Sequence, residues 1–156
     1  MHMEHMHMPL QASMTRARVA SLARAWIGTP YHHQASICGV GTDCLGLVRG
    51  VYRSLYEREA ELAPAYSPDW GEASGQETLL DAARRNLVEN VPPLPHAGDV
   101  IVFRMRPCAI AKHAGIMTSA TTMVHAVERV GTLEVDFARW WQRRLAGVFS
   151  FPGIEV

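Results

Sequence analysis

The chain has 156 residues, with 15 basic and 15 acidic side chains and three cysteines. This length fits one domain with one hydrophobic core, and zero formal charge excludes a long-range field that would attract nucleic acid or an anionic membrane. Three cysteines exclude a disulfide scaffold and fit free thiols in a reducing compartment, and no apolar run approaches the roughly 18 residues of a membrane span. Function must therefore depend on a local site.

The first nine residues alternate mainly between methionine and histidine. Three histidines in such a tract can bind a metal ion, but low-complexity ends of this kind are typically disordered or tag-like. We therefore expect residues 1–12 to lie outside the fold and residues 13–156 to form a single domain. The tract lacks the apolar region of a secretory signal, which predicts synthesis without a signal peptide.

Three helices are predicted before residue 91. Residues 15–27 carry apolar side chains at helical spacing, with Ser13 or Thr15 as the cap, and the second helix runs from Cys44 to about Tyr56. The third covers residues 77–90 and ends at a cluster of prolines. The inward-facing residues are then Val19, Leu22, Ala23 and Trp26; Cys44, Val48, Val51, Tyr52 and Leu55; and Leu80, Ala83, Leu87 and Val91.

The pattern changes to strands in the second half of the chain. Short apolar or alternating runs predict strands at residues 100–103, 113–118, 122–127, 133–135 and 147–151. Asp136 is the expected cap of a short helix holding Trp140 and Trp141, and residues 64–75 form either a lid or a plain surface connection. Helices followed by strands indicate an α+β domain with an antiparallel meander.

Cys44 is the first candidate for chemistry, because it lies where a glycine-containing loop turns into the second helix. The unpaired N–H groups and positive dipole end of a helix N-terminus favour an anion, so the sequence predicts a sulfur biased towards thiolate. The same N–H groups can hold the oxyanion of a tetrahedral intermediate. The alternative is a small buried side chain without chemistry.

His113 and His125 are the candidates for its partners. If Ser119 and Ala120 form a hairpin tip, residues whose numbers sum to about 238 to 240 face each other, and 113 plus 125 gives 238. The two imidazoles are then expected to be neighbours on one face of the sheet. A thiol at a helix N-terminus, a histidine base and a polar orienting group form a papain-like nucleophilic site.

Other interpretations of these residues remain open. Cys44, His113 and His125 are all possible zinc ligands, but the closely spaced ligand pairs typical of zinc sites are absent from the sequence. Cys38 and Cys108 are expected to be incidental thiols. Tyr31 begins a polar segment with two histidines that is either a binding wall or a solvated loop.

Five segments, in this order, resemble the NlpC-type cell-wall cysteine peptidases: residues 26–31, 41–48, 97–103, 112–116 and 124–126. The resemblance spans about residue 15 to 153, and several spaced motifs in one order are more specific than any single motif. It implies a compact papain-like core in which N-terminal helices pack on a small antiparallel sheet formed by the C-terminal half.

The resemblance also implies roles for individual residues. Cys44 becomes the nucleophile and contributes its backbone N–H to the oxyanion hole, His113 the general base, and His125 the third polar residue. Tyr31 matches a tyrosine that borders the active site, and Asp43 an aspartate that often meets the free amine of the substrate. No metal or other cofactor is implied. Leu45 departs from the pattern, because many relatives have serine there.

The usual substrate of such enzymes is the peptidoglycan stem peptide, most often cut between D-glutamate and a diamino acid. The sequence around Cys44, residues 68–70 and residues 149–152 resemble the branch found in phage tails and gene-transfer agents. We therefore expect a hydrolase made in the bacterial cytoplasm, incorporated into a tail or baseplate, and acting on the periplasmic wall during DNA entry. It is not expected to bind nucleic acid or insert into a membrane. The alternatives are an N-acetylmuramoyl-L-alanine amidase and a catalytically silent structural adaptor.

Overall fold

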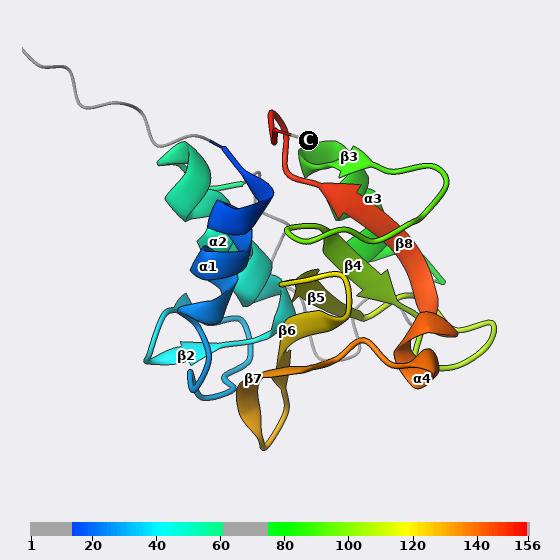
Figure 1. Ribbon diagram of the computed structural model, residues 1–156. Coiled ribbons are helices and arrows are strands. Elements are labelled where there is room, and N and C mark those ends of the chain that lie inside the picture. Colours follow the sequence, from blue (N-terminus) through cyan, green and yellow to red (C-terminus); the bar gives the residue numbers. More distant parts are fainter. Residues whose placement is uncertain (1–13, 61–74, 156) are drawn as a thin grey trace, which may run out of the picture.

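The computed structural model describes residues 14–60 and 75–155. The predictions for residues 1–12, and for residues 64–74 of the expected lid or connection, lie outside these ranges. The described chain is a mixed helix and sheet structure in which α1 and α2 pack together beside the sheet and α3 packs against β3 and β8 (Figure 1). No helix in the described ranges has the length and apolar character required to cross a membrane.

The main sheet has six strands in the order β3-β8-β4-β5-β6-β7, and every neighbouring pair is antiparallel. Strands β4 to β7 form the predicted meander, whereas β8 returns to pair with the free edge of β4. The strand bounds are β3 Val88–Glu89, β4 Val100–Phe103, β5 His113–Met117, β6 Thr122–Val127, β7 Gly131–Asp136 and β8 Leu145–Ser150. The predicted α+β class is thus confirmed.

The helices match the predicted order, with shorter ends. Their bounds are α1 Arg16–Arg24, α2 Cys44–Tyr56, α3 Thr78–Asn86 and α4 Arg139–Gln142. Thr15 caps α1 by accepting a hydrogen bond from the Arg18 N–H. Helix α3 ends four residues earlier than expected, because the chain turns there into β3. A two-stranded hairpin of β1 Ser36–Ile37 and β2 Gly41–Thr42, which was not predicted, precedes α2.

Two sequence-based assignments are wrong. Val91 was expected to face the core but is 85% exposed, because the third helix has already ended before it. Asp136 was expected to cap the short helix, but it ends β7, and α4 begins after Ala138 without a side-chain cap.

Each face of the sheet has its own core. Side chains alternate along a strand, so Val100 and Val102 of β4 face α2 and α3, whereas Ile101 and Phe103 face the opposite side. This second core is completed by Met117, Met123 and Phe137, with Trp141 packed against it. Burial on both faces explains why β4 reads as an uninterrupted apolar run.

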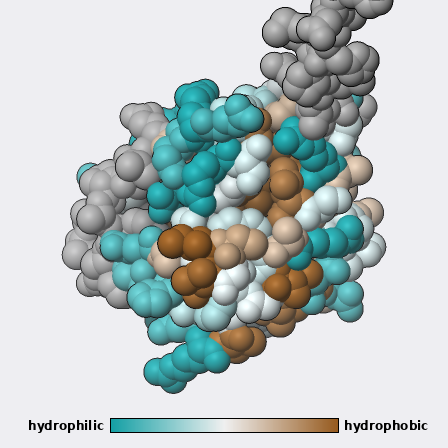
Figure 2. All heavy atoms as spheres, turned by 90° about the vertical axis from the view of Figure 1, so that its left-hand side faces the viewer, coloured by the Kyte–Doolittle hydropathy of each residue, from teal (hydrophilic) through white to brown (hydrophobic). Residues whose placement is uncertain are grey.

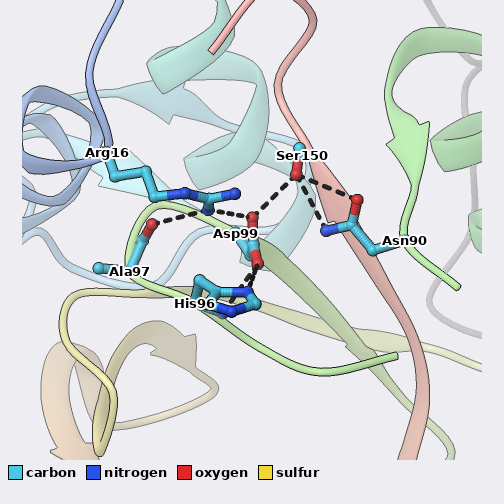
Figure 3. A network of polar contacts seen from close by, with 6 residues as sticks. All are labelled: Arg16, Asn90, His96, Ala97, Asp99 and Ser150. Atoms are coloured by element: carbon cyan, nitrogen blue, oxygen red, sulfur yellow. Dashed lines mark hydrogen bonds and ion pairs between the residues drawn. The ribbon is translucent and has the colours of Figure 1, made fainter. Parts of the chain in front are cut away.

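A buried polar network holds α1 against the start of β4 (Figure 3). The Arg16 guanidinium donates to the Asp99 carboxylate at 2.7 Å and to the Ala97 carbonyl at 3.1 Å. Ser150 of β8 donates to the same Asp99 oxygen at 3.0 Å, and the His96 N–H donates to the other at 2.8 Å. The fully buried Asp99 charge is therefore compensated by three donors from separate segments, one of them the Arg16 cation.

Close backbone contacts fix the position of α2. A Cβ added at Gly50 would lie 2.0 Å from the Trp26 indole, and one added at Gly46 would lie 1.9 Å from the Ala35 carbonyl oxygen. Only glycine permits these approaches. Helix α2 is thus held closely between α1 and the hairpin loop.

Figure 2 shows the molecule from the side of α1, where apolar groups are interspersed with hydrophilic ones.

Candidate active site

Cys44 is the first residue of α2, and Asp43 is the cap of that helix. The Asp43 carboxylate accepts hydrogen bonds from the Gly46 N–H at 2.7 Å and from the Gln34 N–H at 2.8 Å. One acidic side chain therefore satisfies an orphan donor of the first helical turn and ties the preceding loop to it. The position of the thiol relative to the helix is fixed by this cap.

The Cys44 thiol is a neutral group in this setting. Burial, together with the Asp43 charge, raises its pKa to about 12, whereas the N–H groups of Ala114, Leu45 and Cys44 act in the opposite direction. The predicted bias towards thiolate is therefore wrong for the free protein, because desolvation outweighs the helix N-terminus. The thiol donates a long hydrogen bond, 3.7 Å, to the Lys112 carbonyl, which places the sulfur at the start of β5.

His113 and His125 form the predicted pair. Nε2 of His113 lies 2.8 Å from Nδ1 of His125, and the two rings meet edge to face. The observed β5–β6 register sums to 240, within the predicted range, whereas 113 plus 125 gives 238, so the two residues are offset by one diagonal step. Because this difference is an even number, both rings still lie on the same face of the sheet.

Both imidazoles are neutral at pH 7. Burial lowers the pKa of His113 to about 3, with a contribution from the charge of His125, and burial lowers the pKa of His125 to about 4. In a hydrogen bond between two neutral imidazoles, one ring nitrogen donates its hydrogen and the other accepts it. If His113 is the donor through Nε2, its Nδ1 carries no hydrogen and can accept a proton.

Trp141 is the site residue that the sequence analysis missed. Its ring stacks on His113 at a centroid distance of 5.7 Å and meets His125 edge to face at 5.0 Å. Phe103 packs against both Trp141 and His113 from the sheet. The tryptophan had been expected only as part of a short helix, and nothing in the local spacing signals that α4 folds back over the histidines.

One pocket of about 290 Å³ connects these groups. Its lining includes Cys44, His113 and His125, together with Tyr31 and Glu128 at its polar wall. Burial, with smaller contributions from Cys44, Asp43 and Glu128, raises the pKa of the Tyr31 hydroxyl to about 12. A bridge between Tyr31 and Thr42 holds this residue beside the loop of the thiol. Tyr31 is therefore part of the site wall.

Asp43 and Leu45 are placed differently from the other predicted residues. Asp43 is 2% exposed and is used as the helix cap, so its role towards a substrate amine stays a prediction. Leu45 packs against the core between α2, α3 and the sheet, and it lines an apolar cavity there, not the pocket of the thiol. Cys38 and Cys108 are exposed and lie outside that pocket.

The predicted site residues do not combine into a metal centre. Within residues 14–60 and 75–155 there is no group of three or more His, Cys, Asp or Glu side chains arranged to hold a metal ion. The groups that line the pocket of Cys44 are a thiol, two neutral imidazoles, a phenol and the side chains of Lys112, Glu128 and Trp141, with backbone N–H groups at the start of α2.

Comparisons with known proteins agree on the fold. The chain is similar to the NlpC/p60 domain of the peptidoglycan hydrolase SagA, with a TM-score of 0.63 at 18% identity, covering 88% of this chain and 99% of that one. It is similar to an NlpC/P60 family protein from Bacillus cereus, with a TM-score of 0.63 at 17% identity, covering 90% and 41% of the two chains. A lipoprotein-like NLP/P60 protein from Staphylococcus aureus gives 0.57 at 21% identity, covering 90% and 42%.

The last two proteins are much longer, and this chain spans less than half of their length. A search of the curated proteins finds no match. The profile of the NlpC/P60 family matches residues 28–150, which include every element from the loop before Cys44 to the end of β8. The chain belongs to the NlpC/P60 family.

Proposed function

We propose that this protein is a peptidoglycan hydrolase that cuts the stem peptide by thiol catalysis, with Cys44 as nucleophile. The observation that carries the proposal is the 2.8 Å contact between Nε2 of His113 and Nδ1 of His125 in the pocket that Cys44 also lines. Membership of the family and the likeness to the SagA domain, which is named a peptidoglycan hydrolase, support the substrate class.

The reaction begins from a neutral thiol and a neutral imidazole. His113 accepts the Cys44 proton as the sulfur attacks the amide carbonyl, and hydrogen bonding to His125 stabilises the imidazolium that forms. For this transfer the thiol must leave the Lys112 carbonyl, to which it donates in the free protein. His113 then protonates the leaving amine, and water releases the acyl-enzyme.

The oxyanion is best held at the start of α2. The Gly46 N–H is occupied by the Asp43 carboxylate and the Leu47 N–H by the Asp43 carbonyl, so the N–H groups of Cys44 and Leu45 remain for the developing charge. Both already face the sulfur. In this arrangement Asp43 orders the first turn of α2 beside the thiol even if it never touches a substrate.

The finer parts of the proposal concern which bond of the stem peptide is cut and which particle carries the enzyme. We assign the bond between D-glutamate and the diamino acid, and a phage tail or gene-transfer-agent particle that carries the enzyme to the periplasmic wall. The bond is the one most often cut by the enzymes that the sequence resembles, and the particle is suggested by the likeness of the residues around Cys44, residues 68–70 and residues 149–152 to the phage-tail branch. The partners would be tail or baseplate proteins.

A defined muropeptide, which holds both the muramoyl linkage and the stem peptide, tests the proposal. Wild type and Cys44→Ala are incubated with it, and the fragments are identified by mass spectrometry. We expect cleavage after D-glutamate by wild type only, with the fold of the variant checked by circular dichroism. Release of the intact peptide from muramic acid would indicate the amidase, and equal cleavage by Cys44→Ala would remove Cys44 as nucleophile. No cleavage by wild type would favour the structural adaptor.

A further inference from the structure

A second cavity, of about 500 Å³, lies next to the catalytic pocket and is lined by arginines. Its walls include Arg104, Arg106, Arg143 and Arg144, with Trp140 between them. Met105 lines both cavities, and the ring of Trp140 lies 4.7 Å from that of Trp141, which borders the histidines. The arginine cavity therefore adjoins the pocket of Cys44 at Met105.

The positive charge of the cavity is only partly compensated. Arg104 forms an ion pair with Glu77 and also donates to the Ala109 carbonyl. In the part of the chain that the structure describes, Arg106, Arg143 and Arg144 have no carboxylate partner, and Arg106 and Arg143 are exposed. Three guanidinium groups thus share one hollow without an anion of the described chain.

Arg144 is held in place before any ligand arrives. Its guanidinium lies over the Trp140 ring at 3.6 Å, and Nη1 donates to the Trp140 carbonyl at 2.8 Å. The Nε of Arg144 is buried without a hydrogen-bond partner among the described residues. A stacked, oriented guanidinium loses little side-chain entropy on binding an oxyanion.

We propose that this cavity is a subsite for a carboxylate of the stem peptide, held by Arg106, Arg143 and Arg144 while the scissile bond lies at Cys44. The inference rests on the proposed function and specifies which part of the substrate is recognised. Guanidinium groups bind carboxylates through two parallel hydrogen bonds, which gives both orientation and selectivity over an uncharged amide. The subsite therefore favours stem peptides with free carboxylates over amidated ones.

The test uses two synthetic stem peptides that differ only in amidation of their carboxylates. For wild type we expect kcat/KM to be about tenfold or more higher for the free acid, equivalent to at least one ion-paired contact. The double variant R106Q/R143Q should lose this preference through a raised KM for the acid, with little change for the amidated peptide. R85Q, an exposed arginine of α3 outside the cavity, is the matched control and should behave as wild type.

Binding to Cys44→Ala, measured by calorimetry, separates this proposal from the proposed function. Tighter binding of the acid peptide than of the amidated one, abolished by R106Q/R143Q in the same background, would support the subsite even if wild type cleaves neither peptide. Equal binding or equal cleavage of the two peptides by wild type would overturn it. Preferential binding of a glycerol phosphate oligomer, insensitive to peptide amidation, would assign the charge to another wall polymer and would also overturn it.

Discussion

The two faces of the main sheet differ in amino-acid composition and in the role of their side chains. The face under α1, α2 and α3 is filled mainly by aliphatic side chains such as Leu47, Val51 and Ile116. The opposite face has fewer apolar residues, and its margin at the pocket holds Phe103, Trp141 and the two histidines. The helix side therefore mainly stabilises the fold, whereas the other side surrounds the imidazoles with aromatic side chains that exclude water.

The largest expected effect comes from the histidine pair on the aromatic side. His125→Ala should reduce kcat/KM for a stem peptide by about 10²–10⁴, because His113 loses the group that orients it and stabilises its charged form. His125→Asn, which keeps a hydrogen-bonding side chain, should retain more activity than the alanine variant. Turnover and far-UV circular dichroism are measured together. Unchanged turnover in folded His125→Ala would contradict the orienting role.

A matched pair of variants separates the two faces. Leu47→Ala, on the helix side, should lower the free energy of unfolding by about 2–5 kcal/mol because it leaves a cavity in a fully buried core. Trp141→Leu should cost less stability, because Trp141 is only partly buried. Its aromatic contacts with the histidines are worth about 0.5–1.5 kcal/mol each, so kcat should fall by about tenfold.

Urea unfolding and steady-state kinetics of both proteins measure the contrast. Leu47→Ala that remains folded at the assay temperature should have a kcat close to wild type. If Trp141→Leu instead has normal kcat and a raised KM only, the indole is a substrate wall and does not position the histidines.

Acid sensitivity is the last effect that distinguishes the aromatic side from the helix side. His113 and His125 have folded pKa values of about 3 and about 4, below the ordinary value of 6.5, so between these limits the unfolded chain binds more protons. Their stability contribution is therefore complete above pH 6.5 and is lost as the pH falls towards 4, by at most about 1.4 kcal/mol per pH unit for each ring.

Unfolding in urea at pH 7, 6 and 5 checks this expectation, because the carboxylates titrate mainly below that range. His125→Asn removes one of the two groups, so its free energy of unfolding should change less steeply with pH than that of wild type. Identical slopes for the two proteins would show that His125 is not desolvated in the folded state.

The same contrast explains what could be predicted from the sequence. Helix α2 and strand β4 were predicted within a residue of their observed bounds, because Leu47, Val51 and the apolar run of β4 show their burial through periodicity. The pairing of His113 with His125 followed from hairpin arithmetic, because the observed register sum of 240 lies within the predicted range and the two rings lie on the same face. These features depend on local sequence.

The features that were not predicted depend on contacts between distant segments. Trp141 reaches the histidines only because the chain after β7 folds back over the sheet, and no pattern in residues 137–145 specifies that path. The Cys44 pKa was predicted in the wrong direction because burial is a property of the whole domain, not of the helix N-terminus. The β1–β2 hairpin has strands of two residues, too short for a periodic signal.

The absence of a side chain at Gly46 has a consequence for protein engineering. The Ala35 carbonyl occupies the space where a Cβ would lie, and the Ser36 hydroxyl donates to the Gly46 carbonyl at 2.6 Å. The hairpin loop and the start of α2 are therefore packed tightly into one another. To transfer this site to another scaffold, residues 29–50 should therefore be moved as one continuous segment. If the hairpin loop or the start of α2 were moved alone, it would lose the close contacts that the other segment provides.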